Sequence, residues 1–230
     1  GELYSGGFVG RAEKLLDIYN SKNKGELAGK HNGGFVGYSD TVGIVSIRAS
    51  VNEALFTVSK NFKDSTRNGG VAAIGMGEWT VEDFVNKSDI SGMYAGGFFG
   101  WFRSFESYTG GKGWVKSSFK IRNSINEGNI GSLLDTTGYV LGGIVGTLYS
   151  SYDDYQLSDL DRNLITNVVN KGNIYGSRKA YQMGGIVGHN KYSWLFIDGV
   201  ENYGNIENQN VNYIYVGGIL GYGNGIDSVV

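Results

Sequence analysis

Aromatic and acidic side chains gather in two stretches of the chain, residues 101–118 and 147–163. Aromatic faces beside carboxylates and amides suit a sugar, because the apolar face of a sugar ring stacks on the aromatic side chain while its hydroxyls bond to polar neighbours. The pattern therefore indicates a platform that binds a host or matrix glycan or protein. Its candidate contact residues are Trp101, Phe105, Tyr108, Trp114, Tyr149, Tyr152, Asp154, Tyr192 and Trp194. The alternative is that the same rings pack down onto the molecule as a small core of their own.

A weak cation motif lies in the second stretch, where Asp159, Asp161 and Asn163 form a D-x-D-x-N pattern that resembles the start of a calcium loop. An EF-hand loop also needs Gly at its sixth position and Glu at its twelfth, and these are Leu164 and Asn170 here. The residues therefore favour a solvated acidic turn over a metal site. We expect no metal and no cofactor.

Catalytic constellations are sparse in this sequence. The two histidines, His31 and His189, are accompanied by no Ser/His/Asp or HExxH arrangement. Parallel β-helices do host polysaccharide lyases and glycosidases, and the carboxylate pairs at 82–83 and 153–154 could serve such a reaction. Neighbouring carboxylates on a strand point to opposite faces, however. We expect no enzymatic activity, and a carbohydrate-active β-helix enzyme is the alternative.

Two short phrases alternate along the chain and predict the elements that position these residues. The first is a Gly-Gly pair followed by apolar residues, with copies that begin at Gly6, Gly33, Gly69, Gly96, Gly142, Gly184 and Gly217. The second starts with Asn and ends on an apolar residue, with copies that begin at Asn23, Asn52, Asn86, Asn126, Asn170 and Asn202. Such alternation with a period of a few tens of residues is typical of a repeat protein. No unit is long enough to build its own core, so each must stack on its neighbours.

The repeat consists of strands, because β-branched and aromatic residues flank the glycines and no stretch has a sustained helical period. We therefore predict an all-β fold: a right-handed parallel β-helix (β-solenoid) of about seven coils with two adjacent loop insertions. The domain spans residues 1–230. All Gly-Gly pairs should lie in register in one sheet, and the six asparagines should stack in one column at a corner. Asn86 also begins an N-glycosylation sequon, but its place in the column favours a structural role.

Two apolar columns follow the glycines, and adjacent residues on a strand face opposite ways. We therefore expect one column to line the interior and the other to face outward. The first column is Phe8, Phe35, Val71, Phe98, Ile144, Ile186 and Ile219, and the second is Val9, Val36, Ala72, Phe99, Val145, Val187 and Leu220.

Composition limits the partners. With 20 basic and 22 acidic side chains, the chain has no field that favours nucleic acid or an anionic membrane. No apolar stretch approaches the roughly 20 residues that span a bilayer. The 230 residues include 39 Gly but no Pro and no Cys, which suits stacked strands that all need their amide donors. Neither end has a capping helix, so we expect a fragment of a longer chain whose flanking repeats cover the ends.

The GGxVG phrase alternating with the Asn-Gly-aliphatic phrase resembles the GLUG repeats of large bacterial surface proteins. These include adhesins and the regions that flank the peptidase of some immunoglobulin A proteases. The resemblance covers nearly the whole chain, although Ala73 replaces the final Gly of the third copy. It implies a β-helical stalk or binding region of an exported protein, located extracellularly or at the cell surface, and it transfers no catalytic residue.

Overall fold

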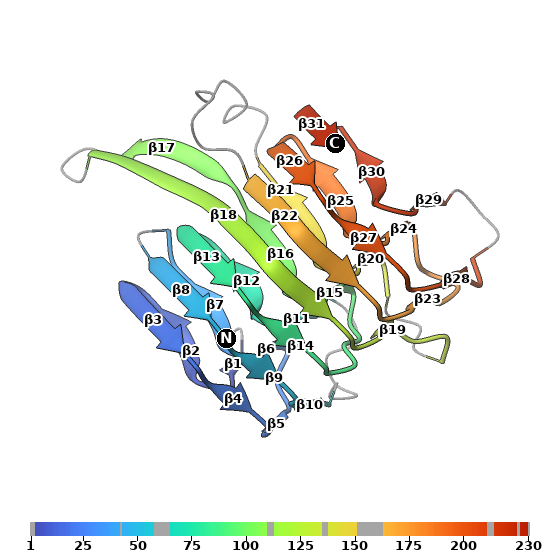
Figure 1. The fold of residues 1–230 in the computed structure, drawn as a ribbon, viewed down its shortest axis with the longest axis horizontal. Helices are drawn as coiled ribbons and strands as arrows, with labels where there is room; N and C mark the ends of the chain where they lie inside the picture. The colour runs from blue at the N-terminus through green and yellow to red at the C-terminus, as the bar shows by residue number, and fades with distance from the viewer. Residues whose placement is uncertain are drawn as a thin grey trace.

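The chain forms a stack of parallel strands that runs from its N-terminal to its C-terminal end (Figure 1). The computed structural model describes residues 3–41, 43–57, 65–109, 113–134, 138–150, 163–210, 214–224 and 226–229. For residues 106–109, 113–115 and 226–229 it describes the backbone alone. Within these ranges every regular element is a β-strand, and no helix is long and apolar enough to cross a membrane. The predicted all-β parallel β-helix is confirmed.

The coils together build four walls, numbered here sheet 1 to sheet 4 in chain order. Sheet 1 holds β1 (Tyr4–Gly6), β6 (His31–Gly33), β11 (Arg67–Gly69), β15 (Tyr94–Gly96), β20 (Val140–Gly142), β24 (Gln182–Gly184) and β29 (Tyr215–Gly217). Sheet 2 holds β2 (Val9–Ala12), β7 (Val36–Ser39), β12 (Ala72–Gly75), β16 (Phe99–Arg103), β21 (Val145–Tyr149), β25 (Val187–Lys191) and β30 (Leu220–Gly223). These two seven-stranded sheets confirm about seven coils.

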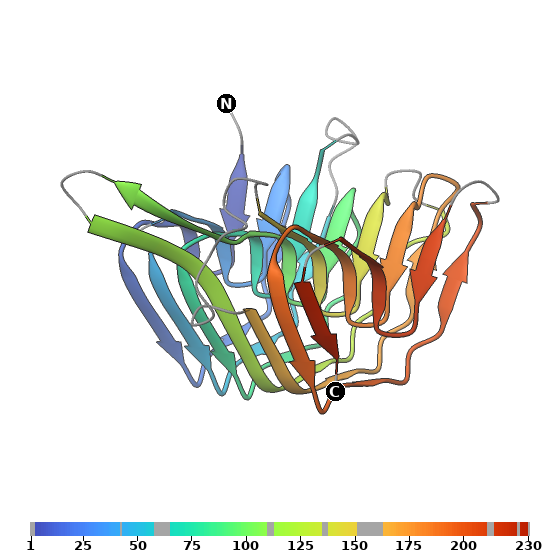
Figure 2. The same ribbon diagram turned by 90° about the horizontal axis from the view of Figure 1, so that it is seen from above.

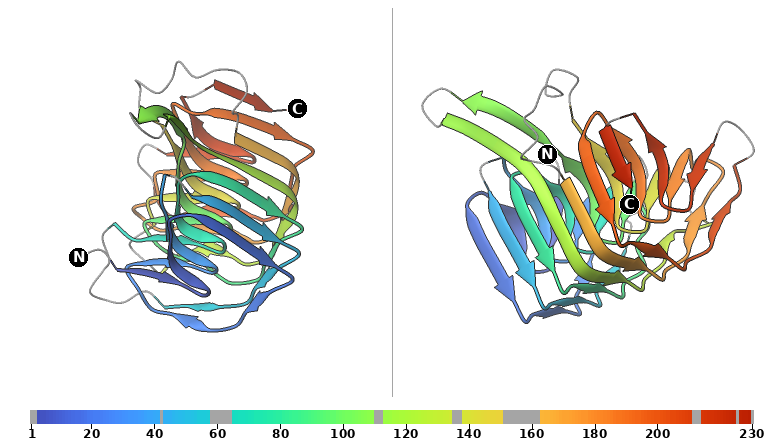
Figure 3. Two further views of the ribbon diagram at one scale, coloured as in Figure 1. Left: turned by 90° about the vertical axis from the view of Figure 1, so that its left-hand side faces the viewer. Right: turned by 45° about the horizontal axis from the view of Figure 1, so that its top comes forward.

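Sheet 3 is the long wall, and most coils cross it in two pieces. It holds β3 (Leu15–Tyr19), β4 (Lys22–Asn23), β8 (Ile44–Arg48), β9 (Val51–Asn52), β13 (Glu78–Glu82), β14 (Val85–Asn86), β17 (Phe105–Thr109), β18 (Gly113–Asn126), β22 (Asn163–Asn170), β26 (Trp194–Asp198), β27 (Glu201–Asn202) and β31 (Ile226–Val229). Sheet 4 is in two parts, β5 (Glu26–Leu27) with β10 (Leu55–Phe56), and β19 (Ile130–Gly131) with β23 (Ile174–Gly176) and β28 (Ile206–Asn208). Figure 2 and Figure 3 show the successive coils side by side, with the curved sheets running along the stack.

The Gly-Gly phrase and the Asn phrase are two halves of one packing arrangement. The first glycines pair in register along all of sheet 1. The second glycine of each of the first six coils faces the Asn of the same coil: a Cβ added to Gly97 would lie 2.6 Å from Cγ of Asn126. A Cβ on the first glycine, Gly96, would lie 2.1 Å from the Phe99 carbonyl oxygen. Only glycine permits both approaches, which explains why the two phrases occur together.

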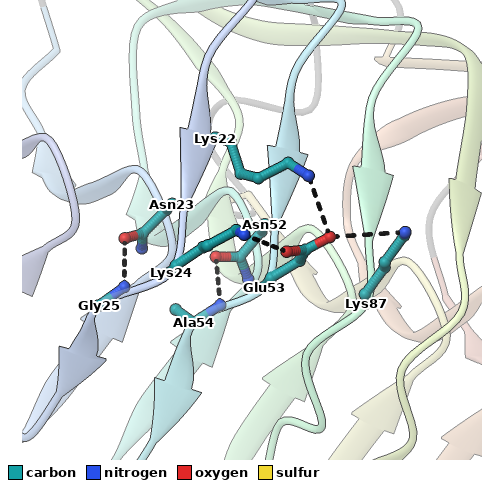
Figure 4. Close-up of polar contacts among 8 residues, drawn as sticks. All are labelled: Lys22, Asn23, Lys24, Gly25, Asn52, Glu53, Ala54 and Lys87. Carbon is teal, nitrogen blue, oxygen red and sulfur yellow. Dashed lines mark hydrogen bonds and ion pairs between the residues drawn. The ribbon is translucent and has the colours of Figure 1, made fainter.

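The predicted asparagine column exists and is hydrogen-bonded. Asn52 Nδ2 donates to Asn86 Oδ1 at 2.8 Å, and the same bond continues from Asn86 to Asn126 and from Asn126 to Asn170, each at 2.7 Å. The last bond, from Asn170 to Asn202, measures 2.8 Å. Asn23 instead donates to the Gly34 carbonyl oxygen at 2.6 Å. Figure 4 shows the start of this asparagine ladder, where Asn23 and Asn52 each accept from the backbone two residues on.

The asparagine ladder separates two apolar cores. The larger core fills the space between sheets 2 and 3, and the smaller one fills the space between sheets 1 and 4. Apart from Phe8, which is 45% exposed, both apolar columns after the glycines belong to or pack against the larger core, with Phe35, Val36, Ile186 and Val187 all fully buried. The prediction that one column faces outward is therefore wrong. Phe35 lies in the bend between β6 and β7, where the alternation of a regular strand does not apply.

The first predicted insertion is a β-hairpin. Strands β17 and β18 pair antiparallel from Phe105 opposite Ser117 to Thr109 opposite Gly113, and the hairpin projects beyond the stack (Figure 2). In the second insertion, residues 151–162 lie outside the described residues. The predicted meeting of the two insertions stays a prediction.

Candidate functional site

The outer faces of sheets 1 and 2 meet in an angle beside the Gly-Gly bend, and aromatic rings line this angle. Ring contacts cross it near both ends of the stack: Tyr4 lies 4.9 Å from Tyr38, and Tyr215 lies 4.6 Å from Tyr222, measured between ring centroids. The sheet 2 residues on this side stand five positions after each first glycine, in one register. They are Arg11, Tyr38, Ile74, Trp101, Thr147, His189 and Tyr222.

Trp101 is the centre of this angle in the fourth coil. Its ring stacks on Tyr94 of sheet 1 with centroids 5.7 Å apart, and it meets Tyr149 edge-on at 6.0 Å. The guanidinium carbon of Arg67 lies 3.8 Å from its centroid, a cation–π geometry. Stacking and cation–π contacts therefore already occupy much of the Trp101 ring.

The line of rings continues to the seventh coil. Tyr94 meets Tyr139 at 6.3 Å, and Tyr139 stacks on Tyr181 at 5.6 Å. Tyr215 then contacts Tyr181 at 5.5 Å, and Tyr222 contacts His189 at 5.3 Å. We call this continuous set the aromatic strip: Tyr94, Trp101, Tyr139, Tyr149, Tyr181, His189, Tyr215 and Tyr222. Tyr139 and Tyr215 are its most exposed members, at 39% and 40%.

The aromatic strip is uncharged at neutral pH. Burial raises the pKa of Tyr94, and the neighbouring Arg67 charge opposes that rise in part. Burial, together with the charge of Lys191, lowers the pKa of His189 to about 4, against a smaller opposing effect of its hydrogen bond with Asn224. The imidazole is therefore neutral, and the strip offers hydroxyls and ring surface rather than formal charge.

The structure places the predicted platform residues in several different environments. Trp101 and Tyr149 belong to the aromatic strip, and Lys191 links Tyr149 to Tyr192, with its Nζ 5.3 Å and 5.5 Å from the two ring centroids. Phe105 is only 8% exposed, and Trp194 starts β26 on sheet 3. Burial therefore argues against Phe105 as a ligand contact, and a place for Trp194 beside Trp101 stays a prediction.

Four of the predicted platform residues cannot be placed as side chains. Tyr108 and Trp114 pair across the hairpin through their backbones, and their side chains lie outside the description. Tyr152 and Asp154 lie wholly outside the described residues. Their part in a binding platform stays a prediction.

The weak cation motif is also only partly described by the structure. Asp159 and Asp161 lie outside the described residues, whereas Asn163 is fully buried. Its Oδ1 accepts from the Phe119 backbone N–H at 3.1 Å, and its Nδ2 donates to the Trp194 carbonyl oxygen at 2.9 Å. Asn163 therefore acts within the fold as a link between coils. Over the described ranges, no group of three or more acidic, His or Cys side chains could hold a metal ion.

Sequence reasoning missed the tyrosines of sheet 1, although their spacing carries a signal. Tyr4, Tyr94 and Tyr215 stand two residues before their Gly-Gly pairs, and Tyr139 and Tyr181 stand three residues before theirs. A tyrosine two or three residues before the Gly-Gly pair recurs in five coils, and this recurrence could have placed these rings along sheet 1. Comparisons with family models, with curated proteins and with solved structures found no match to this chain.

Proposed function

We propose that this chain is a non-catalytic β-helical scaffold of an exported surface protein and that it binds a glycan along the aromatic strip. The observation that carries the proposal is the strip itself, an unbroken line of partly exposed rings over the fourth to seventh coils. A rigid stack of coils repeats the same side-chain geometry at every step of roughly 4.8 Å. A polymer of repeating sugars is a suitable ligand for a surface of that kind.

Within the strip, the binding contacts belong to its exposed tyrosines. Trp101 already has Arg67 and Tyr94 against its ring, so it serves mainly to hold the strip in place. Tyr139 and Tyr215 combine exposed ring surface with a hydroxyl that can donate and accept. The rings themselves carry no formal charge at neutral pH, and the two cations beside them, Arg67 and Lys191, already lie against Trp101 and Tyr149, so the ligand should be a neutral glycan.

The surface-protein part of the proposal rests on the resemblance to GLUG repeats and on the rod-like architecture. A stack in which each coil contacts only its neighbours can be lengthened by further repeats without changing the fold. Such a rod suits an adhesin stalk that carries binding sites on one side.

A glycan array with three single variants tests the proposal. We expect the intact chain to retain a neutral glycan, and Tyr139→Ala and Tyr215→Ala to weaken retention with little change in melting temperature. Tyr203→Ala is the matched control, because Tyr203 is 69% exposed and lies outside the strip. An array that retains nothing, or a strip variant that binds like Tyr203→Ala, would refute glycan binding here. Reducing-end formation from a retained glycan would instead support the carbohydrate-active enzyme.

A further inference from the structure

Sheet 4 contains a cleft that lies on a different wall from the aromatic strip. The cleft has a volume of about 650 Å³, and its lining includes Leu55, Phe56, Asp89, Ile90, Leu134 and Tyr175. Two of these side chains are strongly exposed leucines, Leu55 at 60% and Leu134 at 94%. The cleft therefore combines an open volume with apolar surface that faces solvent.

The cleft coincides with a break in the ladder of sheet 4. On one side β10 pairs with β5 of the first coil and with no other described strand, and on the other Ile90 of the third coil forms a bridge with Ile130 of the fourth. A few residues earlier along the chain, the second and third coils are joined, because Asn52 and Asn86 pair in register. Among the described residues, no ladder bond joins Phe56 to the segment 89–91. The second and third coils therefore separate only after the asparagine ladder.

A second column of short polar side chains begins in the third coil, beyond the break. In the later coils a side-chain oxygen accepts from the backbone N–H of the next coil: Asp89 from Asn129 at 2.7 Å, Asn129 from Asn173 at 3.0 Å, and Asn173 from Asn205 at 2.9 Å. Each stands three residues after its ladder asparagine, a position that Leu55 fills in the second coil. Leucine has no acceptor for the Asp89 N–H, so this link is missing between the second and third coils.

The open edge belongs to the backbone of β10. The N–H groups of Leu55 and Thr57 donate to Gly25 and Leu27 of the first coil, at 3.0 Å and 2.9 Å. In a parallel ladder the residue between them directs its N–H and C=O to the opposite side. Phe56 therefore directs both groups toward the third coil, where in later coils the equivalent Ile90 and Ile130 make ladder bonds.

We infer that this cleft takes an extended peptide segment of a protein partner, which adds as a strand to the free edge of β10. Main-chain hydrogen bonds to Phe56 would supply affinity, and alternate apolar side chains would pack on Leu55 and Leu134. A small apolar molecule could fill the volume but would leave the backbone groups of the edge without partners. The inferred site is independent of glycan binding at the aromatic strip.

The test uses the labelled peptide KVTVTVK, acetylated and amidated, with fluorescence anisotropy as the measurement. The variant Leu55→Asn supplies the missing acceptor and should close the break. Its matched control is Leu15→Asn, because Leu15 is 74% exposed but lies on sheet 3. We expect Leu55→Asn to bind the peptide about tenfold more weakly than the unmodified chain, as expected for the loss of one or two hydrogen bonds. Leu15→Asn should bind it unchanged.

Two further measurements keep the result decisive. A peptide N-methylated at alternate amides should lose binding to the unmodified chain by a similar factor, since it cannot donate to a strand edge. Leu134→Ser should weaken peptide binding without changing the melting temperature. This variant therefore tests the cleft even if Leu55→Asn fails to fold. Absence of peptide binding by the unmodified chain would overturn the inference. Equal binding of the N-methylated peptide would also overturn it.

Discussion

Asn126 shows how one side chain connects three successive coils. Its Oδ1 accepts from Asn86 of the coil before, and its Nδ2 donates to Asn170 of the coil after. The same Nδ2 also donates to the Gly128 carbonyl oxygen at 2.8 Å, which holds the turn of its own coil. An amide is the side chain that can donate and accept at once at this length. Aspartate would lack the donors, and leucine would lack both functions.

Replacing Asn126 by alanine should therefore destabilise the fold more than the same change at the end of the ladder. Asn126→Ala removes a donor from Asn170 and an acceptor from Asn86 in a fully buried site. Each orphaned group costs about 1–3 kcal/mol, so we expect a loss of roughly 2–6 kcal/mol. Asn202→Ala is the control, because Asn202 is only partly buried and bonds to one ladder asparagine. Thermal melts compare the two, and equal mild effects would show that the ladder is not cooperative.

His189 should make the stability of the fold depend on pH. Its pKa is lowered to about 4 in the folded chain, mainly by burial, so it stays neutral where an unfolded histidine takes up a proton. Stability is therefore fully present above about pH 6.5 and falls as the pH decreases toward 4. Replacement by Gln keeps a polar side chain without the titration. We expect the unmodified chain to lose about 1–2 kcal/mol more than His189→Gln between pH 7 and 4.5, after allowance for the partly exposed ring. Parallel pH profiles of the two melts would contradict this.

At the scale of the element, a column of left-handed residues bends the long wall of each coil. These residues stand three positions before the ladder asparagines, and all have φ between 47° and 60°: Asn20, Ala49, Asp83, Asn123, Asn167 and Gly199. Asn, Asp and Gly adopt this conformation readily, whereas a residue with an ordinary Cβ is strained by it. Ala49 is therefore the exception in the column.

Ala49→Asn should raise the melting temperature. Ala49 is exposed, so the larger side chain has room, and asparagine relieves part of a strain of roughly 1–2 kcal/mol. A gain of about 1 kcal/mol corresponds to about 2–4 °C in a chain of this size. Ser46→Asn is the control, because Ser46 lies in the regular strand β8, where asparagine is disfavoured. A lower melting temperature for Ala49→Asn would show that the bend does not store strain.

At the scale of the whole molecule, the sequence predicts the positions of residues that recur in every repeat, but it does not predict the features that differ from one coil to the next. Gly33 and Gly69 could be placed in register because the same phrase surrounds both. Phe35 was wrongly given an alternating pattern, because the bend before β7 turns two adjacent side chains into one core. Tyr181 was missed because its position before the glycines shifts by one residue between coils. Leu55 was missed because the break in sheet 4 beside it depends on how the coils stack, which the repeat phrases do not record.

A column of side chains whose charge alternates in sign also runs along the stack of coils. The residue after each of the first five ladder asparagines alternates in sign along the stack: Lys24, Glu53, Lys87, Glu127 and Lys171. Glu53 lies between its neighbours, 3.8 Å from Lys24 and 3.5 Å from Lys87, and also 3.3 Å from Lys22 (Figure 4). Glu127 and Lys171 form a further pair at 3.8 Å. These contacts lower the pKa of Glu53, chiefly through its hydrogen bond from Lys22.

Glu53→Lys should therefore lower the melting temperature in a salt-dependent way. The substitution places a fourth cation among Lys22, Lys24 and Lys87, where a partly exposed carboxylate now neutralises them in part. Repulsion between exposed charges is screened within about 3 Å at 1 M salt, so most of the loss at low salt should be recovered there. Glu78→Lys is the control, because its neighbours in register are the uncharged Ile44 and Ser118. If both variants lose the same stability and recover equally in salt, the alternating column has no part in ordering the coils.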